Sequence, residues 1–261
     1  MQIPILSIIF MSISAILSIG LPIFLFIVFY KKFNVKFIPM LFGIAGFIVF
    51  ALVLESSVHF IVLTKNALMN KPVIYIFYGI FMAGIFEETA RFISFKILKK
   101  KYEGIGTGLA YGVGHGGIEA VIIVGVSMIT NIVFSIIANT GNMEAITGVL
   151  QGRALEQITL LQATSPHLFL IGGIERIFAM SIQISLSIIV FYSVYGKNKL
   201  WLYPFSVILH AIINIPASMM QVGLIGNIYL VELLAFISAV ILVIIAWYIH
   251  KKLKQDTGEY Q

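Results

Sequence analysis

Residues 4–30 read PILSIIFMSISAILSIGLPIFLFIVFY and contain no charged side chain. A helix needs about 20 apolar residues to cross the hydrocarbon core of a bilayer, because it rises about 1.5 Å per residue. This stretch is long enough, and no basic residue precedes it as in a signal peptide. We therefore expect an uncleaved transmembrane helix here.

The whole chain has the same apolar character. Of its 261 residues, 60% are hydrophobic and 11% are charged, whereas a soluble domain carries about 25% charged residues. A water-soluble fold is therefore excluded. The sequence contains no cysteine, which excludes disulfide bonds and thiol catalysis. We expect an all-α fold, a polytopic membrane helix bundle.

Seven stretches are long and apolar enough to span a bilayer: residues 4–30, 37–63, 72–98, 105–138, 167–195, 201–222 and 227–250. Between the fourth and fifth, residues 143–164 have apolar side chains at helical spacing but also several charged and amide side chains. This pattern predicts an amphipathic interfacial helix rather than an eighth span. It is either a plain connector or a lid over a buried site.

No linker or internal repeat divides the sequence, so we expect residues 1–261 to form a single membrane domain with its catalytic core in 72–222. The connections and adjoining span ends on one side hold twelve lysines, whereas those on the other side hold Lys65, Lys71 and Arg153. Cytoplasmic connections carry the excess of Lys and Arg. We therefore expect a multi-pass protein of the cell membrane with its N-terminus outside and its C-terminus cytoplasmic. We expect no nucleic-acid partner, because the net charge of +6 comes from these membrane-facing clusters.

The third predicted span contains Glu87, Glu88 and Arg91. A charge at the centre of a membrane helix costs about 2.5–3.5 kcal/mol and usually marks function. Glu87 and Arg91 are four residues apart and Glu88 and Arg91 are three apart, so either carboxylate can reach the guanidinium. One glutamate would be enough for a structural ion pair, and the doublet therefore favours a functional site.

The fourth predicted span presents two strips of residues at four-residue spacing. Tyr111, His115 and Glu119 form a polar strip, and glycines at 108, 112 and 116 form a smooth strip that admits a neighbouring helix. A histidine in such a place is usually a packed residue, but the glutamate on its own face favours a functional role.

The sixth predicted span contains His210 and Asn214, again four residues apart. Counted from the side expected to be cytoplasmic, the glutamate doublet, His115 and His210 all lie at a depth of roughly 14–18 Å. We therefore expect three spans to present these polar side chains to one cavity. Other charged residues in the spans are less decisive. Glu175 and Arg176 either position a substrate or pair structurally, and Glu55 and Glu232 favour structural or snorkelling roles.

The combination of Glu-Glu-Thr-Ala-Arg at 87–91, Gly-His-Gly-Gly-Ile-Glu at 114–119 and His-x-x-x-Asn at 210–214 resembles the CPBP clan of intramembrane proteases. That clan includes CaaX prenyl endopeptidases, bacteriocin-immunity-type proteins and PrsW-like proteases. The first two motifs look most like its YhfC-like branch. CaaX-type members have three residues between the doublet and the arginine, whereas two intervene here, as in the PrsW-like pattern. The resemblance covers residues 87–214, about half of the chain.

The resemblance implies an intramembrane endopeptidase that hydrolyses a peptide bond of a membrane-associated protein or peptide. Glu87 or Glu88, together with His115, would activate water. His210 and Asn214 would donate hydrogen bonds to the oxyanion. The supporting residues would be Arg91, which orients the doublet, with Tyr111, Glu119 and Glu175.

Three alternatives remain. We expect no cofactor, but zinc bound by His115, Glu119 and His210, with a glutamate of the doublet, is an alternative mechanism, although the motif HExxH is absent. A proton-coupled transporter would also bury glutamate, histidine and arginine, but the sequence lacks repeated halves. A scaffold or immunity protein would keep the fold without the chemistry.

The lysine distribution gives a direct test of topology. A reporter that is active only in the cytoplasm, fused after Lys254, should be active, because seven spans place the C-terminus opposite the N-terminus. A reporter that is active only outside should be silent at the same position and active when fused before residue 4. The reverse pattern would overturn the predicted orientation.

Overall fold

The structure, a computed structural model, describes residues 2–65, 70–141 and 152–254. Within these ranges the regular elements are helices, and η1 and η3 have the wider π-helical turn. They are α1 (Ile5–Phe33), α2 (Phe37–Gly46), η1 (Phe47–Glu55), α3 (Ser56–Lys65), α4 (Pro72–Leu98), α5 (Ile105–Ala120), η3 (Val121–Val126), α6 (Ser127–Thr140), α8 (Gly152–Ala163), α9 (Pro166–Tyr195), α10 (Leu202–Gln221) and α11 (Ile228–Leu253).

Seven continuous helical segments in the described ranges are long and apolar enough to cross a membrane: Ile5–Phe33, Phe37–Lys65, Pro72–Leu98, Ile105–Thr140, Pro166–Tyr195, Leu202–Gln221 and Ile228–Leu253. The predicted all-α membrane helix bundle is confirmed, and the predicted spans agree with these segments within a few residues. Local chemistry explains several helix starts. Pro72 occupies the first turn of α4, where its missing N–H costs nothing. The side chain of Asn227 accepts hydrogen bonds from the backbone N–H groups of Tyr229 and Leu230 at the start of α11.

The chain forms two compact units, one of residues 1–23 and 119–177 and one of residues 24–118 and 178–261. The boundaries fall inside α1, α5 and α9. In the first unit, Ile158 and Leu161 of α8 are buried with Met11, Ala138 and Phe169. The first unit thus has an apolar core that α8 completes.

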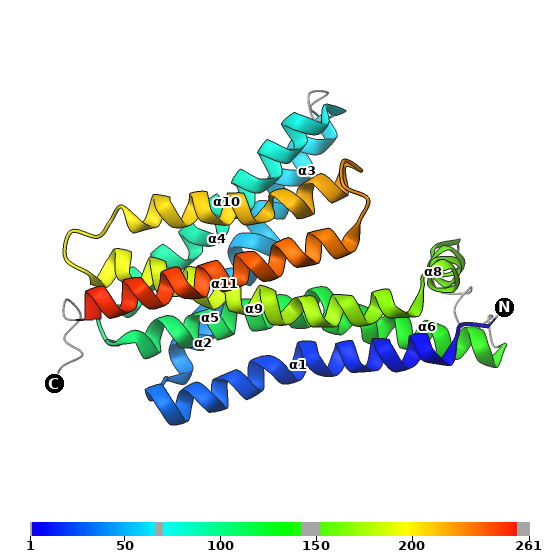
Figure 1. Cartoon of the computed structure of the whole chain (residues 1–261), viewed down its shortest axis with the longest axis horizontal. Helices are drawn as coiled ribbons and strands as arrows, with labels where there is room; N and C mark the ends of the chain where they lie inside the picture. Colours follow the sequence, from blue (N-terminus) through cyan, green and yellow to red (C-terminus); the bar gives the residue numbers. More distant parts are fainter. Residues whose placement is uncertain (1, 66–69, 142–151, 255–261) are drawn as a thin grey trace. The chain divides into compact units, whose positions relative to one another are not determined.

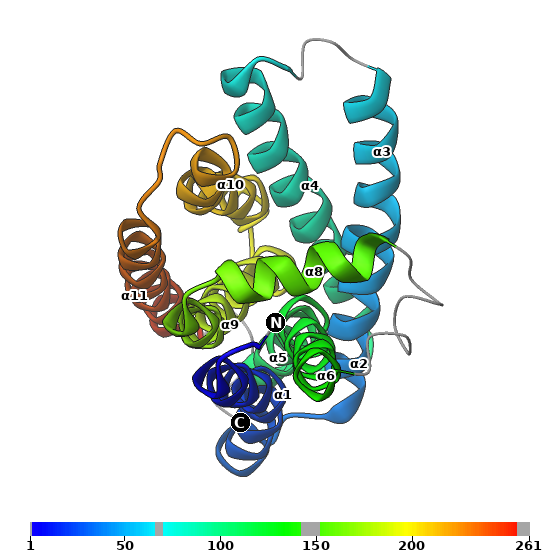
Figure 2. The same cartoon turned by 90° about the vertical axis from the view of Figure 1, so that its right-hand side faces the viewer.

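Within the first unit, α8 crosses the direction of α6. Figure 1 shows α8 end-on and α6 lengthwise, and Figure 2 shows the reverse. A helix that lies along a membrane interface has this direction relative to a spanning helix. The predicted helix over 143–164 corresponds to α8 from residue 152 onward, and residues 142–151 lie outside the described residues. Its interfacial position stays a prediction.

In the second unit, α4 packs against α10, α2 and η1, and α10 packs against α11 (Figures 1 and 2). Much of its core is aromatic, with Phe95, Tyr111, Phe191 and Tyr192 fully buried in one cluster. This unit contains the glutamate doublet and both histidines of the predicted site.

Two glycine contacts hold α5 against its neighbours. A Cβ on Gly114 would overlap the backbone carbonyl oxygen of Met40 in α2, so only glycine fits there. On the predicted glycine strip, a Cβ at Gly112 would lie 2.7 Å from Cα of Ile184 in α9. The strip therefore admits a neighbouring helix, as predicted, and that helix is α9.

The Gly114 contact predicts a stability effect. Gly114→Ala should lower the free energy of unfolding by at least about 1–3 kcal/mol, because the added methyl group meets backbone that must move. Thermal unfolding of the purified protein in detergent measures the change. Gly20→Ala is the matched control, since a Cβ there has no atom within 4 Å and should not lower the melting temperature. Equal melting temperatures for the two variants would contradict the close contact between α2 and α5.

Candidate active site

Four helices of the second unit bring buried polar side chains together. Helix α4 contributes Glu87, Glu88 and Arg91, α5 contributes His115, α9 contributes Gln183 and Ser187, and α10 contributes His210. The structure thus joins the doublet of the third predicted span to the histidines of the fourth and sixth, as the equal depths predict.

Glu87 contacts the first histidine directly. Its Oε2 atom lies 2.9 Å from Nε2 of His115 and accepts a hydrogen bond of 3.2 Å from Nε2 of Gln183. Its Oε2 also lies 3.5 Å from the guanidinium of Arg91. Glu87 is 8% exposed, whereas Glu88 is fully buried. Glu87 is therefore the less buried carboxylate of the doublet.

Glu88 is occupied by structural partners. Its Oε1 atom accepts a 2.8 Å hydrogen bond from Arg91 and lies 2.7 Å from Nδ1 of His210. Arg91 also donates to Ser187 at 3.3 Å and to Gln183. Glu88 thus connects α4 to α10, and Arg91 connects α4 to α9. The partners of Glu88 differ from those of Glu87, although the two glutamates are adjacent in the sequence.

These contacts determine where His210 carries a proton and how His115 is held. An ionised carboxylate only accepts hydrogen bonds, so Nδ1 of His210 donates to Glu88. Nε2 of His210 then points toward Glu87, at 4.0 Å from its Oε1. Nδ1 of His115 is buried without a hydrogen-bond partner among the described residues. The ring of His115 stacks on Tyr111 with a centroid distance of 5.9 Å, so Tyr111 holds this imidazole in place.

Imidazole and carboxylate groups, which these residues supply, are donor types that zinc binds. Two imidazoles and one carboxylate, here His115, His210 and Glu87, are a ligand set of hydrolytic zinc sites. The contact of His210 Nδ1 with Glu88 is the carboxylate–histidine arrangement that orients a metal-binding imidazole.

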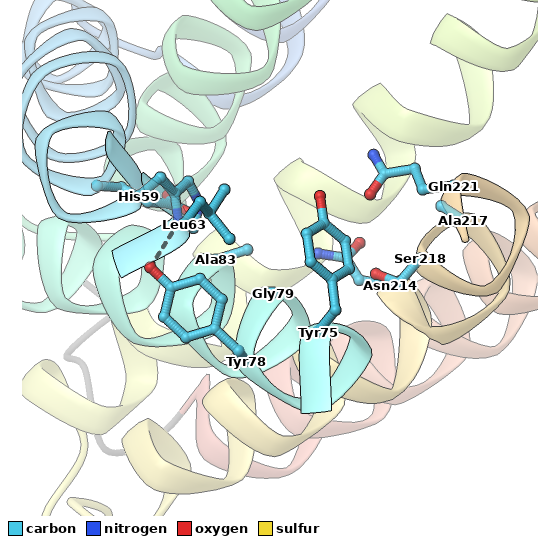
Figure 3. A pocket seen from close by; sticks show the side chains of 11 residues that line it. His59, Leu63, Tyr75, Tyr78, Gly79, Ala83, Asn214, Ala217, Ser218 and Gln221 are labelled. Carbon is cyan, nitrogen blue, oxygen red and sulfur yellow. Dashed lines mark hydrogen bonds and ion pairs between the residues drawn. The ribbon is translucent and has the colours of Figure 1, made fainter. Parts of the chain in front are cut away.

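A polar pocket of about 380 Å³ lies one helical turn from these residues (Figure 3). Asn214, the predicted oxyanion donor, lines this pocket beside Glu55, His59 and Tyr78. Glu55, for which the sequence favours a structural or snorkelling role, is only 8% exposed. Figure 3 shows Asn214 across the pocket from His59.

The remaining predicted residues lie in the first unit. Arg176 donates a 3.3 Å hydrogen bond to Glu119 and also pairs with Glu175. Arg176 is 7% exposed, so these pairs neutralise a buried charge. Of the two predicted roles for Glu175 and Arg176, these contacts favour structural pairing.

Sequence reasoning missed Gln183, Ser187, His59 and Tyr78. The signal for Gln183 was present, because it is an amide in the middle of an apolar span and such groups need a partner. His59 lies four residues after Glu55, and this spacing on one helix face was also readable. Nothing in the sequence marks Ser187 among the many serines of α9.

Comparison with known proteins places this chain in a family. The family model described as YhfC intramembrane metalloprotease matches residues 17–235. The membrane protein YhfC of Bacillus subtilis (strain 168) is 36% identical over 239 residues, which cover 89% of this chain and 92% of that protein. No solved structure matches the chain. By the extent of the model match and the identity to this relative, the chain belongs to the YhfC intramembrane metalloprotease family.

Proposed function

We propose that this protein hydrolyses a peptide bond of a membrane-associated protein or peptide, with Glu87, His115 and His210 at the reaction centre. The contact between Glu87 and Nε2 of His115, at 2.9 Å, carries the proposal. At this distance a proton can pass directly between the carboxylate and the imidazole, inside a membrane-spanning bundle. The family's description as intramembrane metalloproteases supports peptide hydrolysis as the reaction class.

Glu87 acts as the general base in the proposed reaction. It is less buried than its neighbour, and in the proposed reaction water approaches Glu87 rather than Glu88. The carboxylate takes a proton from the attacking water, and His115 gives a proton to the leaving amine. Glu87 then passes its proton to His115 across their 2.9 Å contact, which restores both groups. The hydrogen bond from Gln183 fixes the orientation of the carboxylate.

The developing oxyanion needs hydrogen-bond donors. His210 supplies one in the proposed mechanism when its Nε2 is protonated, because Glu88 already accepts the proton of Nδ1 and stabilises the imidazolium. Asn214 lies one turn further along α10 and lines the adjoining pocket, so its amide is the second proposed donor. Glu88 and Arg91 act as positioning residues that hold His210 and the backbone of α4.

Zinc is the second candidate mechanism, favoured by the donor set of Glu87, His115 and His210. These three residues would hold the ion, which would supply Lewis-acid polarisation of the scissile carbonyl. In that case Nε2 of His210 carries a lone pair rather than a proton, and Glu88 keeps the imidazole in that tautomer through Nδ1. The two mechanisms thus differ in whether Nε2 of His210 carries a proton.

The glutamate mechanism predicts a large loss of activity in Glu87→Gln. Cleavage of a membrane-inserted substrate in proteoliposomes should fall by about 10²–10⁴-fold, because removal of a general base costs that much. Glu232→Gln, which also removes a carboxylate from a spanning helix, should keep nearly the full rate.

Glu88→Gln separates the two members of the doublet. Its main expected defect is a lower melting temperature, since breaking a buried ion pair costs about 3–5 kcal/mol. If instead Glu87→Gln melted early and Glu88→Gln stayed folded but inactive, the assignment of Glu87 as the base would be wrong.

Metal content distinguishes the two mechanisms. With glutamate–histidine catalysis, purified wild type, His115→Ala and His210→Ala should show equal, substoichiometric zinc by mass spectrometry, and chelation should leave wild-type cleavage unchanged. About one zinc per chain in wild type, lost in both variants, would overturn this mechanism in favour of zinc catalysis.

A further inference from the structure

The pocket of Figure 3 is formed by three segments of the second unit. Glu55, His59 and Leu63 come from η1 and α3, Tyr75, Tyr78, Gly79 and Ala83 come from α4, and Asn214, Ala217, Ser218 and Gln221 come from α10. Its volume of about 380 Å³ is at the small end of ligand sites. A cavity of this size admits one long side chain and its neighbours, but not a helix.

A hydrogen-bonded chain leads across one wall to Glu55. The hydroxyl of Tyr78 lies 2.8 Å from Nδ1 of His59, and Nε2 of His59 lies 3.1 Å from Oε1 of Glu55. A neutral imidazole satisfies both contacts, since Tyr78 donates to Nδ1 and Nε2–H donates to Glu55. This arrangement orients Glu55 and leaves its negative charge without a matching cation.

The described lining residues of the pocket include no lysine or arginine. Glu55 is 8% exposed, and an ionised carboxylate removed from water is costly unless a cation pairs with it. The other polar lining groups, which include Asn214, Ser218 and Gln221, are neutral. Glu55 contributes the one carboxyl group among the described lining residues, and a positively charged group bound beside it would pair with its ionised form.

The pocket lies within reach of a substrate bound at the reaction centre. Ala83 precedes Glu87 by four residues on α4, and Asn214 follows His210 by four residues on α10, which is about 6 Å along each helix axis. An extended peptide advances about 3.3–3.6 Å per residue. A side chain one or two residues from the scissile bond therefore meets the pocket.

We propose that this pocket is a substrate subsite that binds a lysine or arginine side chain next to the scissile bond, with Glu55 as the specificity-determining residue. This proposal extends the proposed function and rests on it, because only the proposed proteolysis makes the bound side chain part of a substrate. Leu63, Gly79 and Ala83 offer apolar surface to the methylene stem, and Glu55 receives the charged end. His59 and Tyr78 are positioning residues that aim the carboxylate.

Thiol labelling tests the charge preference of the pocket without any need for catalysis. The chain has no cysteine, so Ser218→Cys in the full-length protein reports from the pocket alone. A cationic trimethylammonium-ethyl methanethiosulfonate should react faster than the anionic sulfonatoethyl reagent, and their rate ratio should be about tenfold higher than at Gly226→Cys. Gly226 is an exposed control, because a Cβ there has no atom within 4 Å.

Glu55→Gln in the Ser218→Cys background should reduce the rate ratio to that of Gly226→Cys. Glu55→Asp should restore part of it, which shows that charge rather than misfolding is responsible. A ratio at Ser218→Cys that equals the Gly226→Cys value, or that does not change in Glu55→Gln, would overturn the cationic subsite.

Cleavage then tests the role in specificity. The probes are bilayer-inserted quenched peptides that differ only in Lys, Met or Glu at positions within two residues of the cleaved bond. Wild type should prefer Lys over Met in kcat/KM by about tenfold or more, as a charge-assisted hydrogen bond gives, and Glu55→Gln should lose that preference while still cleaving the Met peptide. Equal preference in both proteins would refute the specificity role. If wild type cleaves none of the peptides, the proposed function is contradicted, and the labelling result alone decides whether the pocket binds cations.

Discussion

The ion pair between Arg91 and Glu88 is the constraint on which the second unit depends. Both side chains are fully buried, in a bundle with apolar spans where unpaired charges are not tolerated. The pair is stabilised because Ser187 and Gln183 accept hydrogen bonds from the guanidinium and His210 donates to the carboxylate. One contact therefore fixes α4 against both α9 and α10. It also leaves Glu87 to contact His115 and Gln183, where we propose that it acts as the general base.

In the proposed mechanism, this arrangement accounts for the presence of two adjacent glutamates. A single glutamate beside Arg91 would serve either as a structural partner or as a base, but its surroundings could not suit both roles. Adjacent residues on a helix point about 100° apart, so Glu88 turns toward Arg91 and His210 while Glu87 turns toward His115. The division of labour follows from helical geometry alone.

Much of the fold and of the candidate site could be predicted from the sequence, because the chain spans a membrane. Charged residues in apolar spans are costly enough to be noticed, so Glu87, Glu88, Arg91, His115 and His210 stand out, and counting residues along each span gave their common depth. Neutral polar groups such as Ser187 carry no such signal. The rotation of each helix about its own axis was also not readable, which is why Glu55 seemed isolated although it lines a pocket with His59 and Tyr78. The division of the chain into two units inside continuous helices has no signature in composition or linkers.

Helices α4 and α10 carry both the proposed reaction centre and the adjoining pocket, one turn apart on each helix. A motion of α4 relative to α10 would therefore change the two together. Coupling of this kind would link binding of a side chain in the pocket to the position of the proposed general base, since binding energy in one place can orient groups in the other.

The π-helical stretch η1, which ends at Glu55, limits how the span over residues 37–65 can vary in length. A π-helical turn accommodates an extra residue within an otherwise α-helical rod. Deleting one residue from it would turn all that follows by about 100° around the axis. Glu55 and His59 would then face lipid or a neighbouring helix instead of the pocket. Related chains that keep the buried carboxylate should therefore keep the number of residues between Gly43, where α2 meets α5, and Glu55, even where the side chains in between differ.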